Sequence, residues 1–389
     1  MKIGLERGVV TAVAADTPDG RELLVNVNGQ EERAYEEPGV VRQAEVGDSI
    51  LLNTTGVRLG LGTGGVHFVV AVLENAGLGS PAQLTSPGHI MKLRYTPLQR
   101  AVHAVEEPDH PLHDRIREGD DLQGAPVVIC ELHSMVPAVA MTLQYELEKA
   151  GRPRCNIAYV MTDGAALPMA FSKTVRALKE QELLSGTVTV GHAYGGDLEA
   201  VNLYSGLLAA RHAIGADAII VAMGPGIVGT GTQYGHTGIE VGQAVNAVHS
   251  LGGEPVVVPR LSFADARERH HGVSHHTLTA LGQVALAPAT VPLPNLEEGE
   301  TRLIFKQITQ AGLPERHRFV GVGGRSILDA ADHFQVPLRT MGRTLAEDPA
   351  FFLAAGAAGE WVSRRIKKPP RHHAVRSSAS AGALLADKN

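Results

Sequence analysis

Apolar strand patterns recur at a regular interval through the middle of this 389-residue chain. Strands that are apolar throughout and alternate with helices are typical of a parallel sheet covered on both faces. The spacing of about thirty residues is the length of a strand–helix–strand unit. The sequence therefore predicts a Rossmann-like α/β domain over residues 125–362. Its strands begin at Val127, Ile157, Thr187 and Asp217, and its first helices cover residues 136–149, 168–184 and 198–214.

The N-terminal part has a different pattern. Short strand patterns at residues 8–14, 22–28 and 66–73 are separated by turn signals such as Asn28-Gly29, and no helical period appears. We expect a small β-barrel over residues 1–85. The remaining segments are predicted as a connection between the domains over residues 86–124 and a flexible tail over residues 363–389.

One glycine-rich loop follows the most apolar strand pattern of the chain. Bare backbone between a buried strand and a helix is where α/β proteins commonly hold an anion. The dinucleotide-type spacing of its first glycines is a weak match, because Pro225 removes a donor and no helix follows at once. A packing loop is the alternative. The expected ligand-binding residues are Gly224, Gly226, Gly229, Thr230, Gly231, Thr232, His236 and Thr237, joined by Arg260 after a later strand.

Polar residues follow several of the predicted strands. Because the carboxyl ends of parallel strands lie along one edge, these residues are expected to gather in one crevice. Histidine and carboxylate groups suit acid–base work near neutral pH, and a serine could act as a nucleophile. Each has a structural alternative as a packed histidine, a turn residue or a helix cap. The catalytic candidates are His133, Ser134, Asp163 and His192.

The segment from Ser262 to His276 contains four histidines, at positions 270, 271, 275 and 276. Clustered histidines invite a metal interpretation, but the H-E-x-x-H spacing of zinc enzymes is absent. Solvated or packed histidines are the alternative. The sequence therefore assigns no metal ligand, and no cofactor is identified.

Composition limits the partners. The net charge of −6 argues against a global basic field that would recruit nucleic acid. No apolar run is long enough to span a membrane, and the charged N-terminus does not resemble a signal peptide. Cys130 and Cys155 form no disulfide or zinc pattern, which favours a reducing cytoplasm. We expect a cytoplasmic protein that binds a small anionic or phosphorylated ligand, with a homo-oligomer left open.

Three stretches carry a resemblance to a known family: Gly88–Pro97, the loop Gly224–Gly238 and Ser262–His276. In these stretches the chain resembles a bacterial family catalogued as domain of unknown function 3866. The resemblance implies no activity, cofactor or catalytic residue. Two functions remain open: an enzyme that transforms a phosphorylated or nucleotide-like metabolite at the sheet edge, and a non-catalytic protein that senses such a metabolite.

Overall fold

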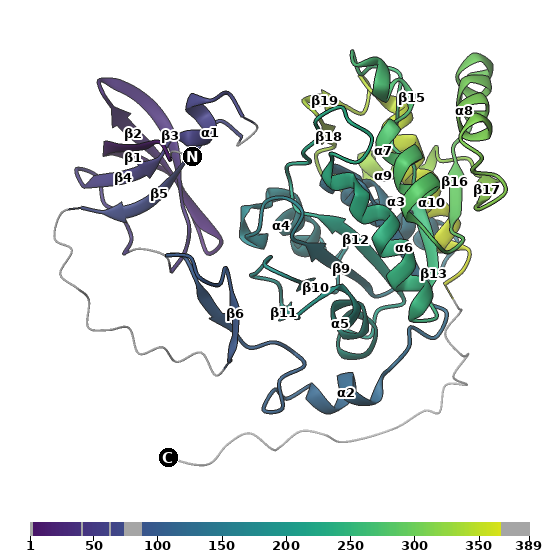
Figure 1. The fold of residues 1–389 in the computed structure, drawn as a ribbon, viewed down its shortest axis with the longest axis horizontal. Coiled ribbons are helices and arrows are strands. Elements are labelled where there is room, and N and C mark those ends of the chain that lie inside the picture. Colours follow the sequence, from purple (N-terminus) through teal and green to yellow (C-terminus); the bar gives the residue numbers. More distant parts are fainter. Residues whose placement is uncertain (1–2, 40–41, 62–63, 74–87, 367–389) are drawn as a thin grey trace.

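The computed structural model describes residues 3–39, 42–61, 64–73 and 88–366. Within them, a small β-barrel lies beside a larger α/β domain (Figure 1). Both parts of the predicted fold class are therefore confirmed. The predicted tail over residues 363–389 lies outside the described residues from position 367 onward, as do the last residues assigned to the barrel.

The barrel is closed and has the strand order β1-β2-β3-β5-β4. Alternating side chains such as Leu23 and Val25 fill its interior, as expected for strands with one buried face. Its strand β3 escaped the sequence analysis because the run is dominated by glutamates, although Ala34 is fully buried. The elements are β1 (Leu5–Thr17), β2 (Gly20–Val27), β3 (Gln30–Glu36), β4 (Ser49–Asn53), α1 (Thr55–Arg58) and β5 (His67–Val72).

A hairpin connects the two domains. It pairs β6 (Ile90–Lys92) with β7 (Arg100–Val102), and α2 (His113–Glu118) follows. Lys92 is buried, and its Nζ donates to the carbonyl oxygens of Thr189 and Ala193 and pairs with Glu199 at 2.6 Å. This lysine thus holds the hairpin against the sheet.

The larger domain contains an eight-stranded sheet in the order β11-β10-β9-β12-β8-β13-β16-β17, in which every pairing is parallel. The central strands are buried throughout, which explains their apolar sequences. The strands are β8 (Pro126–Cys130), β9 (Ile157–Thr162), β10 (Gly186–Thr189), β11 (Leu198–Glu199), β12 (Ala218–Met223), β13 (Glu254–Val258), β16 (Thr290–Leu293) and β17 (Arg318–Gly321).

Helices cover both faces of this sheet (Figure 1). One layer contains α3 (Val136–Lys149), α9 (Ser326–Phe334) and α10 (Pro349–Ser363), which pack on one another. The other contains α5 (Leu203–Leu208) and α6 (Glu240–Ser250). The remaining elements are α4 (Lys173–Glu180), α7 (His275–Thr279), α8 (Glu298–Gln310), β14 (Leu261–Ser262), β15 (Gly272–Val273), β18 (Arg339–Thr340) and β19 (Arg343–Thr344), with short 3₁₀ and π turns between them.

Two predicted helices are shorter than expected. The helix expected over residues 168–184 begins only at Lys173, because the side chain of Ser172 accepts a hydrogen bond from the backbone N–H of Val175 and caps it. The helix expected from residue 198 begins at Leu203, where Asn202 forms a capping box, and Leu198 belongs to a strand.

Side chains on both domains meet at a shared interface. The rings of Tyr35 in the barrel and Phe171 in the α/β domain lie edge to face, with centroids 5.3 Å apart. Arg176 of α4 pairs with Asp19 at 2.5 Å, and Arg100 pairs with Glu37 at 2.9 Å. These contacts position the barrel at the carboxyl edge of the sheet.

The order of the central strands creates a switch point. β8 and β12 are neighbours, but the chain leaves β8 through α3 towards β9 and leaves β12 through α6 towards β13, in opposite directions across the sheet. The two connections cross, because β9 lies beyond β12 and β13 lies beyond β8, and they run on opposite faces of the sheet. Connections that leave neighbouring strands towards opposite faces leave a crevice at the carboxyl ends of the two strands, where ligands of open α/β sheets bind.

Candidate functional site

Two adjoining cavities occupy the switch point and the domain interface. One has a volume of 490 Å³ and lies between the residues that follow β8 and β12, with Arg339 on its wall. The other has a volume of 430 Å³ and lies between the barrel and α4, next to Tyr35 and Phe171. Residues lining both are His133, Thr174 and Pro225. A domain interface and a switch point are both preferred places for small-molecule sites.

Of the predicted residues, His133, Ser134 and Gly226 line the larger cavity. Gly226 has a φ of 114°, which favours glycine, and its side-chain position faces open space. Ser134 donates a hydrogen bond to Thr340 at 3.1 Å, so its hydroxyl is held by another hydroxyl and not by a base.

His133 is fixed at both ring nitrogens. Tyr159 donates its hydroxyl to the carbonyl oxygens of Ala222 and Met223, so it accepts a hydrogen bond from Nδ1 of His133 at 2.9 Å. Nε2 of His133 then accepts a hydrogen bond from the Ser172 hydroxyl at 2.6 Å. Burial lowers the pKa of His133 to about 4, so the ring is neutral at pH 7.

This geometry identifies Ser172 as a residue that the sequence analysis missed. A buried serine hydroxyl within hydrogen-bond reach of a histidine, whose other nitrogen is oriented by a third group, is the arrangement of an activated nucleophile. Ser172 also caps α4, which is its structural role. No sequence signal could have paired it with His133, because 39 residues separate the two.

Asp163 and His192 lie together but in another place along the same edge. Oδ2 of Asp163 accepts a hydrogen bond from the backbone N–H of His192 at 2.8 Å, and Nδ1 of His192 accepts one from the backbone N–H of Leu93 at 3.1 Å. Both residues line a cavity of 360 Å³ with Arg94, and His133 is not among the residues lining it. His133 and Asp163 therefore lie along one edge of the sheet but line different cavities. The ends of β8, β9 and β12 also meet at a further cavity of 220 Å³, which Asp163 lines as well.

The glycine-rich loop makes hydrogen bonds with itself. The backbone N–H and the hydroxyl of Thr230 both donate to the carbonyl oxygen of Gly235, at 2.9 Å each. The hydroxyl of Thr232 lies 3.0 Å from that of Thr230 and accepts from the backbone N–H of Gly235. Gly229, Thr230, Gly231 and Thr232 are exposed. These two hydroxyls therefore have partners inside the loop in this structure.

The end of the loop leads into α6 without a side-chain cap. The hydroxyl of Thr237 lies close to the sulfur of Met223 and to the loop's own backbone. Glu240 accepts a hydrogen bond from Thr162 at 2.6 Å, so Thr237 and Glu240 form no capping box, although their spacing would allow one. Gly224 is buried, and a Cβ there would lie 2.1 Å from the carbonyl oxygen of Ala166.

Arg260 belongs to a buried ion-pair network and not to an open pocket. Its Nη1 lies 3.1 Å from Oε1 of Glu131, the residue that follows β8, and its Nη2 lies 3.6 Å from Asp265. Glu131 also accepts hydrogen bonds from His276 at 2.9 Å and Thr277 at 3.0 Å. The sequence analysis assigned Glu131 no role because a carboxylate after a strand carries no sign of its partners.

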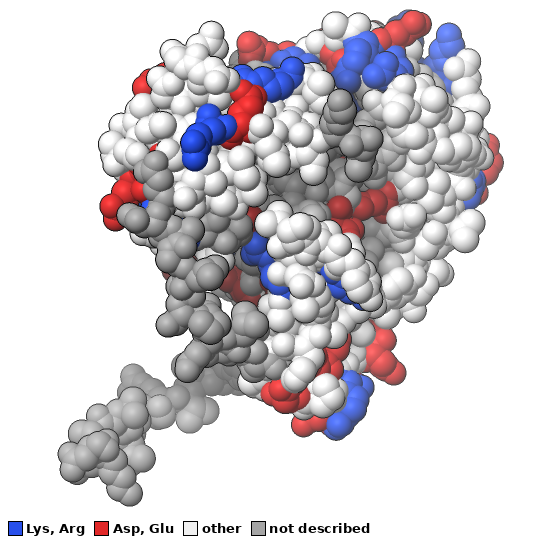
Figure 2. Space-filling view, turned by 60° about the vertical axis from the view of Figure 1, so that its left-hand side comes forward, with Lys and Arg blue, Asp and Glu red and all other residues white. Residues whose placement is uncertain are grey.

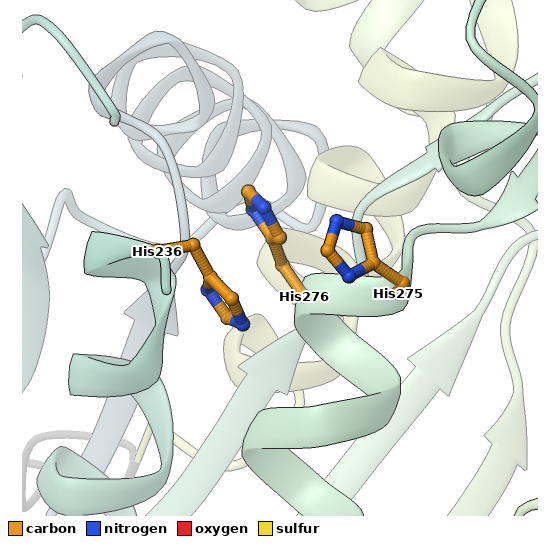
Figure 3. A group of neighbouring side chains, drawn as sticks. All are labelled: His236, His275 and His276. Atoms are coloured by element: carbon orange, nitrogen blue, oxygen red, sulfur yellow. The ribbon is translucent and has the colours of Figure 1, made fainter. Parts of the chain in front are cut away.

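Next to this network, His236 from the end of the glycine-rich loop meets His275 and His276 from the start of α7 (Figure 3). The rings of His236 and His276 are stacked, with centroids 3.8 Å apart. The loop and the histidine segment are thus brought together in space, although 38 residues separate His236 from Ser274 at the cap of α7.

Charge is mixed on the face of the molecule shown in Figure 2. Lysine and arginine side chains are interspersed there with aspartate and glutamate side chains, and the face is hollowed near its centre. Among the residues that the structure describes, no helix has the length and apolar character needed to cross a membrane.

Comparison with known proteins places the chain at the level of a family. No curated protein and no solved structure gave a significant match. The profile of one family, described as a protein of unknown function (DUF3866), matches residues 33–359. The match begins within β3 of the barrel, includes β4 and β5, and covers the whole parallel sheet. The chain belongs to the DUF3866 family of proteins of unknown function.

Proposed function

We propose that this protein binds a phosphorylated or nucleotide-like small molecule in the cleft between the barrel and the sheet. The observation that carries the proposal is the pair of adjoining cavities, 490 and 430 Å³ in volume, that meet at His133 on the switch point of the sheet. Together they are within the size range of small-molecule sites.

The lining of the cleft suits such a ligand. Arg339 supplies positive charge in the larger cavity, and Lys173 and Thr174 lie in the first turn of α4, where the helix dipole favours an anion. Tyr35 and Phe171 provide flat apolar surface in the smaller cavity, against which a base could stack. The anionic group of such a ligand would therefore lie near Arg339 and the first turn of α4, and its aromatic group would lie against Tyr35 and Phe171.

A small ligand is favoured over a nucleic acid. Two arginines on the outside of the barrel already have carboxylate partners: Arg33 pairs with Glu22 at 2.9 Å, and Arg58 pairs with Glu6 and Glu32 at 2.7 and 2.8 Å. Phosphate binding by these groups would require those pairs to break. Cys130 and Cys155 are buried and unpaired, in keeping with a cytoplasmic place of action.

Gly226→Val tests the cleft in a thermal-shift screen with inorganic phosphate, sugar phosphates and nucleoside mono-, di- and triphosphates. The matched control is Gly215→Val, because Gly215 also has a positive φ, of 75°, and open space at its side chain but lies outside the cleft. Both variants should lose stability through backbone strain of roughly 1–3 kcal/mol. Only Gly226→Val should lose the ligand-induced shift. A wild-type protein that none of these ligands stabilises, or a Gly226→Val variant with the full shift, would contradict the proposal.

Ser172→Ala separates an enzyme from a sensor once a ligand is found. In an enzyme, Oγ of Ser172 would attack the phosphorus of the phosphorylated ligand while Nε2 of His133 takes the hydroxyl proton. The P–O bond to the leaving group would break, and the leaving oxygen would receive that proton. The variant should therefore bind the ligand but lose turnover, as measured by mass spectrometry of the products. If the wild-type protein binds its ligand without converting it, the sensing function is supported instead.

A further inference from the structure

Three histidines from two distant segments of the chain converge beside the buried Glu131. Ring nitrogens of His236, His275 and His276 lie within 4.8 Å of one another. His236 and His276 are buried and His275 is half-buried. The three rings come from two elements, the end of the glycine-rich loop and the first turn of α7 (Figure 3).

Each of these rings keeps one buried nitrogen without a hydrogen-bond partner among the described residues. These atoms are Nδ1 of His236, Nε2 of His275 and Nε2 of His276. A buried polar atom that lacks a partner costs about 1–3 kcal/mol. Three such atoms within one cluster are not accounted for by ordinary packing, since buried polar groups in folded proteins almost always have partners.

The opposite nitrogens of two rings are held in place. Nδ1 of His276 lies 2.9 Å from Oε1 of Glu131, and Nε2 of His236 lies 3.1 Å from the carbonyl oxygen of Gln233. A carboxylate or a carbonyl that receives one N–H of an imidazole fixes its tautomer and leaves a lone pair on the other nitrogen. This is the usual second shell of a metal-binding histidine.

We propose that His236, His275 and His276 bind a divalent transition-metal ion of the zinc class. Three imidazoles are a common protein ligand set for such ions, and they leave a fourth position for water or for an anionic ligand. Oxygen-loving ions such as Mg²⁺ are disfavoured, because the three free atoms are all nitrogens. Glu131 is a positioning residue, which orients His276 through Nδ1.

Metal binding requires a rearrangement of the rings. His236 and His276 are stacked with an angle of 6° between their planes, whereas lone pairs in the ring planes must point to one ion at about 2.0–2.1 Å. At least one of these two rings must therefore turn about its side-chain torsions when the ion binds.

The glycine-rich loop gains a role from this site. A Cβ on Gly229 would lie 3.0 Å from Nε2 of His276, the nitrogen that is free to bind the ion. Glycine at this position therefore keeps the loop close to the histidines without covering the binding atom. The φ of Gly229 is not in the left-handed region, so space at the cluster, and not backbone conformation, explains the glycine.

Metal titration of the full-length chain tests the proposal. Metal is first removed with EDTA. Binding of added Co²⁺ is then followed by visible absorption, and the affinity for Zn²⁺ is measured by competition with a chromophoric chelator. The wild-type protein should bind one equivalent of either ion. His236→Gln and His276→Gln should each weaken Zn²⁺ binding by about 100-fold or more, since even the loss of a second-shell partner weakens it by 10–100-fold. His271→Gln, an exposed histidine of the same segment, is the matched control and should bind as the wild type.

Two further variants test the metal site without disturbing Glu131. If His276→Gln fails to fold because Glu131 loses a partner, His275→Gln and Gly229→Ala still test the site, since neither removes a contact of Glu131. Both should weaken Zn²⁺ binding. The proposal is overturned if the wild-type protein binds no equivalent of Co²⁺ or Zn²⁺, or if these two variants bind Zn²⁺ as tightly as His271→Gln. Gly226→Val should keep full Zn²⁺ affinity, so failure of the cleft proposal is distinguishable from failure of the metal site.

Discussion

Glu131 and Arg260 form an ion pair in which both side chains are buried, with Oε1 and Nη1 3.1 Å apart. Glu131 leaves the end of β8 and Arg260 follows β13, so the pair joins two neighbouring strands at the carboxyl edge of the sheet. Burial would raise the pKa of Glu131, but the hydrogen bond from His276 and the charge and hydrogen bond of Arg260 outweigh burial and lower it to about 2. The carboxylate is therefore ionised at pH 7, and Arg260 depends on it.

Glu131→Gln should destabilise the protein by about 3–5 kcal/mol, because it leaves the Arg260 charge buried without its main partner. Urea denaturation measures the free energy of unfolding. Glu298→Gln is the control, since Glu298 pairs with Arg302 on the exposed face of α8. That pair should contribute no more than about 0.5 kcal/mol. Equal losses of unfolding free energy in the two variants would show that the buried ion pair contributes no more to stability than the exposed one.

His133 should make stability depend on pH. Its pKa is lowered by burial from the ordinary value of 6.5 to about 4, so between these values the unfolded chain binds more protons than the folded chain. The contribution of His133 is fully present above pH 6.5 and is lost as the pH falls towards 4, by about 3 kcal/mol in total. Unfolding in urea between pH 4 and 8 should show this loss. His133→Gln should flatten the profile in this window, whereas His249→Gln, at an exposed position on α6, should follow the wild type. Parallel profiles for both variants would contradict the assignment.

Gly191→Ala should disturb the Asp163 cavity. A Cβ at Gly191 would lie 2.3 Å from Oδ2 of Asp163, the atom that accepts the hydrogen bond from the backbone of His192. Gly191 also has a φ of 63°, so alanine at this position strains the backbone even if Asp163 moves away. Gly215→Ala carries similar strain at a φ of 75° without a neighbour within 4 Å and serves as the control.

The measurement is again the free energy of unfolding. Gly215→Ala should lose roughly 1 kcal/mol through strain alone, and Gly191→Ala should lose about 1–3 kcal/mol more through displacement of the carboxylate. A Gly191→Ala variant as stable as its control would mean that Asp163 moves aside at no cost, and the hydrogen bond to His192 would then contribute little.

The sequence by itself determined the fold class, because that class depends on local periodicity. Apolar strands about thirty residues apart, with helix patterns between them, are sufficient to predict a parallel sheet, and α3 lies at the predicted residues, Val136–Lys149. Alternation and turn residues were likewise sufficient to predict the barrel. The two exceptions are elements that local periodicity does not describe. β3 is formed through tertiary contacts, and the start of α5 is set by the cap at Asn202.

Only the tertiary structure decided which side chains meet. Glu131 comes from the end of β8, His236 from the end of the glycine-rich loop and His276 from the start of α7, and no pattern in the sequence indicates that they meet. The loop predicted to hold an anion forms hydrogen bonds within itself and places His236 against the histidines of α7. Periodicity reports which face of an element is buried. The partner of a buried charge or imidazole is set by how the chain crosses the sheet, and that information is not local in the sequence.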